Sequence, residues 1–177
     1  MLCGSLCVKY ILDSYKINYI KINKKMKWLT ELALTLKRAG SFNIKVFCYN
    51  SNLYEDYKLL SKSNLSFDGF IYIKEALNNN IPIIEKRLSI NELKREITQN
   101  KYIILCVESK VFNNDFNMKG GHFIILNKIN KNNLVKVINP TKDKYEIKYL
   151  SLDFLIRCCK NYGAWRVIIK EEKWLRY

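Results

Sequence analysis

The stretch GGHFIILNKINKNNLVKVINP, residues 120–140, decides the fold. Its two halves, residues 121–129 and 134–139, are rich in β-branched and aromatic residues, which is typical of short β-strands. The four residues between them, 130–133, are typical of a tight connection. The stretch therefore predicts an antiparallel hairpin, in which the end of the second strand lies beside the start of the first.

Helices are expected mainly before this hairpin, and strands around it and after it. The N-terminal part predicts helices over residues 5–15, 27–39, 54–60 and 67–77, a strand over 44–49 and a short extended piece from Pro82. Residues 70–73 could equally be extended. Ser89 and Glu92 form a capping-box pattern for a helix over 90–98. The remaining patterns predict strands over 101–108, 144–149 and 164–170 and a helix over 151–160. We therefore expect an α+β fold and a single domain over residues 1–177.

The chain is strongly basic, with 31 Lys and Arg against 16 Asp and Glu and a net charge of +15. The densest patch, residues 16–27, holds five lysines and no acidic residue. Such a field favours an acidic partner, although charge runs are also ordinary solvated surface. Nucleic acid is an unlikely partner, because no base-reading motif or glycine-rich nucleotide loop accompanies the charge.

The chain carries no sign of a membrane segment, a metal site or a cofactor. No apolar run reaches the roughly 18 residues that a membrane-spanning helix needs, and the N-terminus lacks the pattern of a secretory signal. The six cysteines show neither metal-type spacing nor a disulfide framework. We therefore expect a cytoplasmic protein with no membrane association, no metal and no cofactor.

Cys3 is the first residue with reactive potential, since it lies at the head of the first expected helix. A thiol attacks a carbonyl as the thiolate, and a helix N-terminus or a nearby imidazole lowers the thiol pKa. Gly4 would let a substrate approach the sulfur, and Ser5 offers a backbone N–H in the first turn. Cys7, one helical turn later, is expected to face the core. The alternative is that Cys3 is an incidental cysteine.

His122 is the only histidine of the chain and follows two glycines at the start of an expected strand. Gly121 would clear space for a substrate backbone, and a general base needs only to come within hydrogen-bond reach of the nucleophile. Asn139 ends the next strand, so the hairpin would place its amide beside His122 and hold the tautomer of the ring. A structural histidine and an ordinary Asn-Pro turn are the alternatives.

Three motifs taken in order resemble a known superfamily. They are Cys-Gly-x-x-Cys at residues 3–7, Gly-His-Phe-x-x-Leu at 121–126 and Asn-Pro at 139–140. The order is similar to papain-like cysteine peptidases of the bacteriocin leader-processing type. Residues 28–33 and 162–165 extend the resemblance to the guanylyl-cyclase-domain-containing branch.

The resemblance implies a papain-like fold, with N-terminal helices, the nucleophile helix first, and a C-terminal antiparallel sheet that carries His and Asn. It implies that Cys3 is the nucleophile, His122 the base and Asn139 the residue that orients the base. Cyclase activity finds no support, since neither paired metal-binding carboxylates nor a phosphate loop can be placed.

The sequence departs from the family pattern in one respect. Papain-like enzymes normally carry a Gln about six residues before the nucleophile as an oxyanion donor, whereas only Met1 and Leu2 precede Cys3. Losing such a donor costs on the order of a hundredfold or more in rate. The expectation is a different second donor, with Gln99 and Asn117 as candidates, or an acyl donor more activated than an amide, such as a thioester.

Three functions therefore remain open from the sequence. The first is acyl transfer, in which Cys3 takes an acyl group from an acidic carrier protein and passes it to an amine. The second is a peptidase that cleaves a peptide such as a leader. The third is a binding module that has kept the fold without turnover.

Overall fold

The computed structural model describes residues 3–18, 20–26, 28–40, 42–48, 68–141, 144–159 and 165–171. The helix expected over residues 54–60 and the family-like stretch 162–164 lie outside these ranges. No helix within them is long and apolar enough to cross a lipid bilayer.

A seven-stranded sheet forms the centre of the molecule. Its order is β2-β1-β7-β3-β4-β5-β6. The β2–β1 pair is parallel and every other neighbouring pair is antiparallel. The strands are β1 (Phe42–Cys48), β2 (Ile83–Glu85), β3 (Tyr102–Glu108), β4 (Gly121–Ile129), β5 (Leu134–Pro140), β6 (Tyr145–Ser151) and β7 (Arg166–Glu171).

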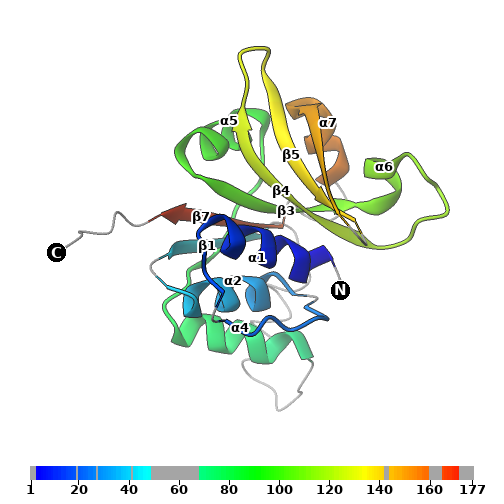
Figure 1. Cartoon of the computed structure of the whole chain (residues 1–177). Helices are drawn as coiled ribbons and strands as arrows, with labels where there is room; N and C mark the ends of the chain where they lie inside the picture. The colour runs from blue at the N-terminus through cyan, green and yellow to red at the C-terminus, as the bar shows by residue number, and fades with distance from the viewer. Residues whose placement is uncertain are drawn as a thin grey trace.

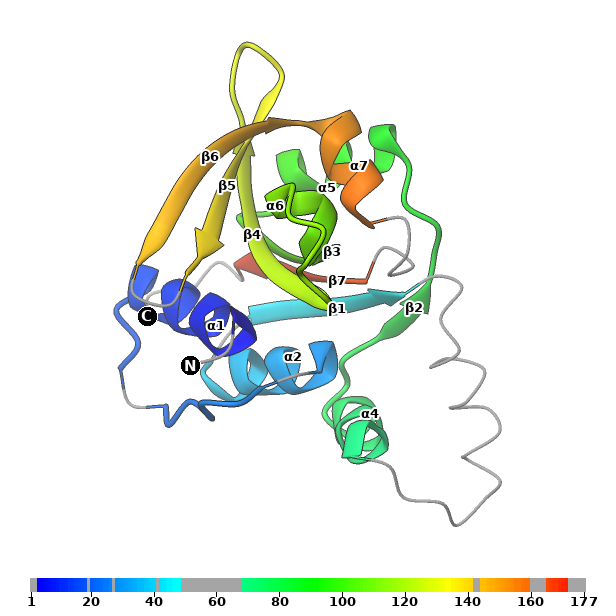
Figure 2. The same ribbon diagram turned by 90° about the vertical axis from the view of Figure 1, so that its right-hand side faces the viewer.

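Helices cover both faces of this sheet (Figures 1 and 2). One layer holds α1 (Cys3–Ser14), α2 (Leu29–Arg38) and α4 (Asp68–Asn78), and the other holds α5 (Ile90–Gln99), α6 (Ser109–Asn113) and α7 (Leu152–Cys159). In Figure 2, strands β4, β5 and β6 curve around the second layer. The layers explain why the central strand β3 is buried along its whole length.

Two apolar cores result from the alternation of side chains along the strands. Phe123 and Ile125 of β4 pack toward α1 and α2, in what we call the α1-side core. Ile124 and Leu126 pack toward α5 and α7, in the α5-side core. Residues 123–126 of β4 can therefore be assigned alternately to the two faces of the sheet, which determines how the candidate site is built.

The α+β class and most expected elements are confirmed. The strand over residues 121–129 has the predicted bounds, and the Ser89 hydroxyl accepts a hydrogen bond from the Glu92 N–H at 3.2 Å, as the capping box predicts. The expected C-terminal antiparallel sheet is only part of what is found, because β7 lies between β1 and β3 and joins the C-terminal strands to the N-terminal ones in one sheet. That sheet is mixed, since β2 pairs parallel with β1, whereas both pairings of β7 are antiparallel.

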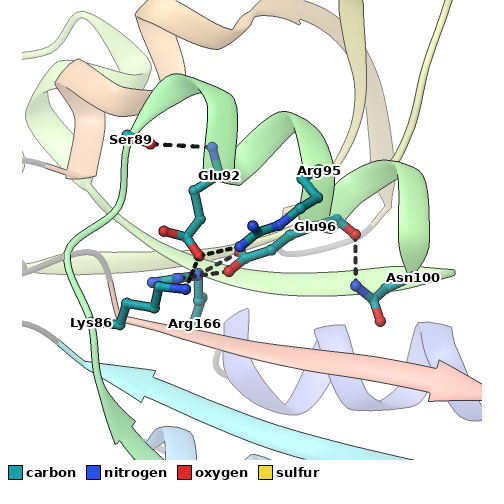
Figure 3. A network of polar contacts seen from close by, with 7 residues as sticks. All are labelled: Lys86, Ser89, Glu92, Arg95, Glu96, Asn100 and Arg166. Atoms are coloured by element: carbon teal, nitrogen blue, oxygen red, sulfur yellow. Dashed lines mark hydrogen bonds and ion pairs between the residues drawn. The ribbon is translucent and has the colours of Figure 1, made fainter.

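A buried ion pair links this inserted strand to the α5 layer. Arg166 of β7 has no exposed surface, and its guanidinium makes two 2.7 Å hydrogen bonds to the carboxylate of Glu96. Figure 3 shows the pair beside a second, partly exposed group, in which Lys86 and Arg95 both bind Glu92. Arg166 also stacks 4.5 Å from the ring centroid of Phe47. The pair therefore fixes β7 against α5 and β1.

We expect Arg166→Met to lower the free energy of unfolding by about 3–5 kcal/mol, because it leaves the Glu96 carboxylate buried without its cation. Adding Glu96→Leu should restore much of the loss. Arg95→Met, which breaks an exposed pair, is the matched control and should cost at most about 1 kcal/mol. Urea denaturation followed by circular dichroism measures all three. A loss below about 1 kcal/mol for Arg166→Met would contradict the role of the pair.

Candidate active site

The nucleophile candidate, Cys3, is the first residue of α1 and is partly buried against the α1-side core. Its sulfur accepts a hydrogen bond from the backbone N–H of Phe123 in β4 at 3.4 Å. The backbone N–H of Gly4 also stabilises the charged sulfur. The start of α1 is thus in direct contact with the strand that carries the histidine.

Close packing around Gly4 makes this contact possible. A Cβ atom at Gly4 would lie 3.0 Å from both the Leu32 side chain and the Met26 carbonyl oxygen, and 3.2 Å from the Phe123 ring. Gly4 therefore faces the interior, where its missing side chain lets α1 approach α2 and β4. The expected role of Gly4 in substrate approach stays a prediction beside this packing role.

Ser5 is also fully buried, and its side chain has a structural function. Its hydroxyl donates to the Asn23 carbonyl oxygen at 2.7 Å and accepts from the Met26 N–H at 3.2 Å. The side chain ties the segment between α1 and α2 to the first turn of α1. The expected use of the Ser5 backbone N–H in substrate binding remains a prediction.

His122 reaches the sulfur from the other face of the sheet. It lies opposite Val107 in β3 and shares the α5-side face with Ile124 and Leu126. Its ring centroid is 5.8 Å from that of Phe112 in α6. Each of the two side chains shifts the pKa of the other, that of Cys3 downward and that of His122 upward, so the imidazole lies beside the sulfur. The nucleophile and base candidates are therefore brought together from two different layers.

A gap between two strands allows this meeting. The pairing of β4 with β5 runs from Ile129–Val135 to Ile125–Ile138, although β4 begins at Gly121 and β5 continues to Pro140. Helix α1 contacts both strands, and the Tyr145 hydroxyl of β6 donates to the Leu6 carbonyl oxygen at 3.1 Å. The N-terminal turn of α1 thus lies where β4 and β5 separate.

Asn139 completes the group, and the hydrogen bond predicted from the hairpin is present. Its Oδ1 lies 2.7 Å from His122 Nε2. Since Oδ1 only accepts, Nε2 must donate, which leaves Nδ1 for the Cys3 sulfur. Asn139 is almost fully buried at the end of β5. The three residues expected to act together therefore lie together, with His122 between the Cys3 sulfur and the Asn139 amide.

Glu146 adds a fourth residue to this group, next to Asn139, and was not found from the sequence. It pairs directly with Asn139 across β5 and β6, and its carboxylate accepts a 3.2 Å hydrogen bond from Asn139 Nδ2. A carboxylate only accepts, so Glu146 favours the amide orientation that presents Oδ1 to His122. Lys148 lies 3.8 Å from Glu146. The signal in the sequence is the short connection 141–144, which places Glu146 opposite Asn139.

The electrostatics of the site favour a thiolate beside an imidazolium. Burial of the Cys3 sulfur opposes its charge, but the hydrogen bond and positive charge of His122, with the N–H groups of Phe123 and Gly4, outweigh burial and lower the Cys3 pKa from 9.0. Burial likewise opposes charge on His122, yet Cys3 and Asn139 raise its pKa above 6.5, against the repulsion of Lys148. Each group stabilises the charged form of the other.

The other five cysteines lack this environment. Each is buried, and burial raises the pKa of Cys7 well above 9.0, that of Cys106 to about 12 and that of Cys158 to about 11. Burial also raises the pKa of Cys159. The Cys7 thiol packs in the core, as expected, with its sulfur 3.5 Å from the Phe123 carbonyl oxygen. A thiol reagent should therefore report on Cys3 alone in the folded protein.

The remaining sequence candidates lie at different distances from this group. Gly121 is exposed and pairs with Glu108 at the start of β4, next to His122. Its expected contact with substrate stays a prediction. Gly120 has a positive φ of 85° with open space around it. Asn117 is exposed in the loop before these glycines.

Gln99 lies at the wrong end of the sheet for an oxyanion donor. It lines a cavity of about 820 Å³ with β1, β7 and α5 residues that include Lys45, Lys170 and Arg95. It comes just before Tyr102, which begins β3, whereas Val107 pairs with His122. Five residues of strand span about 17 Å. Neither Gln99 nor this cavity, which no candidate catalytic residue lines, belongs to the site.

The pH dependence of Cys3 alkylation tests the electrostatic pairing. The wild type should react with iodoacetamide below pH 9, since the lowered pKa of Cys3 keeps thiolate present there. His122→Ala removes one of the groups that lower the Cys3 pKa, so burial should raise that pKa. Labelling of Cys3 at pH 6.5 should then be at least about tenfold slower. Peptide mapping by mass spectrometry, with Cys3→Ala as the blank, measures both. Superimposable pH profiles for wild type and His122→Ala would contradict the pairing.

Neither a protein-family model nor a curated protein matches the chain. The papain-like resemblance therefore stays an expectation drawn from the sequence motifs, and the function has to be argued from the chemistry of the site.

Proposed function

We propose that the protein is a cysteine-dependent acyl-transfer enzyme that forms a thioester on Cys3 and passes the acyl group to an amine. The observation that carries the proposal is the grouping of Cys3, His122 and Asn139, in which His122 is hydrogen-bonded to Asn139, the Cys3 pKa is lowered and the His122 pKa is raised. An activated nucleophile beside a base that a third group orients is the arrangement that covalent acyl transfer requires.

In the first half-reaction the Cys3 thiolate attacks the carbonyl carbon of an acyl thioester. The carbon–sulfur bond to the donor breaks, and the donor sulfur takes the proton that His122 carries. The products are an acyl group on Cys3 and the free thiol of the donor. His122 is left neutral with its proton on Nε2, held by Asn139.

In the second half-reaction an amine attacks the Cys3 thioester. Neutral His122 accepts the amine proton at Nδ1 as the carbon–nitrogen bond forms. The Cys3–carbon bond then breaks, which releases an amide and restores the thiolate beside the imidazolium. Asn139 keeps the ring in one orientation through both steps.

The developing oxyanion would lie beside the N-terminal turn of α1. The first N–H groups of a helix have no acceptor within the helix, and the helix dipole is positive at this end. Since Cys3 is the first residue of α1, a carbonyl bonded to its sulfur is close to these donors. The net charge of +15 supports an acidic donor, of which an acyl carrier protein is the simplest example.

Peptide hydrolysis is the second candidate, because water can replace the amine and a peptide can replace the thioester without any change in the three residues. The exposed Gly121 and the open space at Gly120, beside His122, favour it, since they leave room for a peptide backbone. The two candidate functions differ in the acceptor that removes the acyl group from Cys3, which is an amine in transfer and water in hydrolysis.

Acyl-enzyme formation is the direct test. We expect the protein, treated with an acyl carrier protein charged with a medium-chain thioester or with an acyl N-acetylcysteamine thioester, to gain one acyl group on Cys3. Acid quenching and intact-protein mass spectrometry detect it. His122→Ala should acylate at least about a hundredfold more slowly, and Cys3→Ala should not acylate. Cys48→Ala, which removes another thiol, should behave as wild type.

Discharge of the acyl-enzyme then identifies the acceptor. Loss that accelerates in proportion to added amine, with an amide as product, supports transfer. Loss that is independent of amine and faster than hydrolysis of the donor supports a hydrolase. Absence of any adduct on Cys3 with all donors would contradict the proposal.

A further inference from the structure

Three lysines lie in the segment that joins α1 to α2. Lys21, Lys24 and Lys25 are exposed, and within the described part of the chain none of their ammonium groups forms an ion pair. We call these three residues the lysine turn. Three like charges close together repel one another and so destabilise the folded chain. Their position relative to the candidate site therefore suggests a role in binding.

The lysine turn is held against the residues next to the nucleophile. The Ser5 hydroxyl bonds to Asn23 on one side of Lys24 and Lys25 and to Met26 on the other. The Met26 carbonyl oxygen is so close to Gly4 that a Cβ atom there would lie 3.0 Å from it. The lysine turn therefore lies beside the residues that immediately follow Cys3.

Asn23 fixes the conformation of the turn itself. Its Oδ1 accepts a 3.1 Å hydrogen bond from the Lys25 N–H, which is the pattern of an Asx-turn. Its Nδ2 donates at 3.0 Å to the Glu31 carboxylate, which is buried on α2. The side chain of Asn23 thus joins the turn to the second helix.

Apolar residues on both sides of the lysines anchor the segment in the α1-side core. Met26 is buried, and Ile20 and Ile22 are partly buried against that core. Lys21 lies between the two isoleucines and is exposed. The backbone of the segment is therefore fixed, and its three exposed lysines hold their positive charge beside the site.

We propose that the lysine turn is the docking surface for the acidic protein that delivers the acyl thioester to Cys3. The inference rests on the proposed function and adds to it the place where the donor binds. Carboxylates of the donor would pair with Lys21, Lys24 and Lys25 while its thioester arm reaches the sulfur. Charge complementarity of this kind accelerates association and fixes orientation.

An acidic protein fits this surface better than nucleic acid does. All the basic side chains in residues 16–27 are lysines, and arginine, whose planar guanidinium is best suited to bidentate recognition of phosphate and nucleic acid, is absent. The turn is also adjacent to a nucleophile whose chemistry is acyl transfer. A surface that binds nucleic acid would not have to lie beside that nucleophile.

The test compares two triple variants with the same change in charge. Lys21→Glu, Lys24→Glu and Lys25→Glu reverse the lysine turn. The control reverses Lys94, Lys128 and Lys131, which are exposed on α5 and at the far end of β4. Binding of fluorescent acyl carrier protein is measured by anisotropy in a Cys3→Ala background at 50 mM salt, so that docking is read without chemistry. Acylation is measured with the charged carrier and with the N-acetylcysteamine thioester.

We expect reversal of the lysine turn to raise the Kd and the KM for the carrier at least about tenfold, with less than a twofold change for the N-acetylcysteamine thioester. The control triple should change the Kd less than threefold. Replacement of the same three lysines by Gln should give an intermediate effect and serves as the second variant if reversal prevents folding.

Equal weakening of carrier binding by both triples would overturn the inference, as would unchanged binding in the lysine-turn variants. Loss of reaction with the small thioester at unchanged carrier Kd would also overturn it. Single-stranded RNA that binds the wild type and not the lysine-turn variants, at unchanged carrier Kd, would assign the surface to nucleic acid instead. A wild type that binds the carrier through the lysine turn yet never acylates would contradict the proposed function and leave the docking surface supported.

Discussion

The hydrogen bond from the Phe123 N–H to the Cys3 sulfur is the contact on which the candidate site depends. It joins the first residue of the chain's first helix to a strand that begins more than a hundred residues later. It forms because β4 and β5 stop pairing at Ile125–Ile138 and because Gly4 has no side chain to hold α1 away. Without this contact between α1 and β4, the nucleophile and base candidates would remain in separate layers.

The charge pair is stable only because several small effects act together. Burial alone opposes both a thiolate and an imidazolium. Cys7 and Cys106 illustrate the effect on a thiol, since burial raises the pKa of each. At Cys3, two backbone N–H groups and the imidazole act against burial. At His122, Cys3 and Asn139 act against burial. Glu146 accepts a hydrogen bond from the Asn139 amide, and Lys148 lies near Glu146. The site is therefore a sequence of contacts that starts on α1 and ends on the edge strand β6.

Local patterns in the sequence were sufficient to predict the β4–β5 hairpin and the contact between His122 and Asn139 that follows from it. The strand over residues 121–129 and the Ser89 cap follow from residue type and spacing, and the His122–Asn139 bond follows from hairpin geometry. The place of β7 between β1 and β3 was not predictable, because pairing between distant strands leaves no local signal. The packing role of Gly4 and the Ser5 bonds to residues 23 and 26 depend on tertiary approach. Helix α6 spans only five residues, too few for a periodic pattern.

The single histidine of the chain makes the central claim directly measurable. Long-range ¹H–¹⁵N NMR of ¹⁵N-labelled protein reports the protonation of both ring nitrogens of His122 without overlap. The account predicts an imidazolium that persists above pH 6.5 in the wild type, because its raised pKa depends on Cys3. On deprotonation the remaining proton should be on Nε2, and Cys3→Ala should lower the pKa. A ring that titrates at the same pH in wild type and Cys3→Ala, or that keeps its proton on Nδ1, would contradict it.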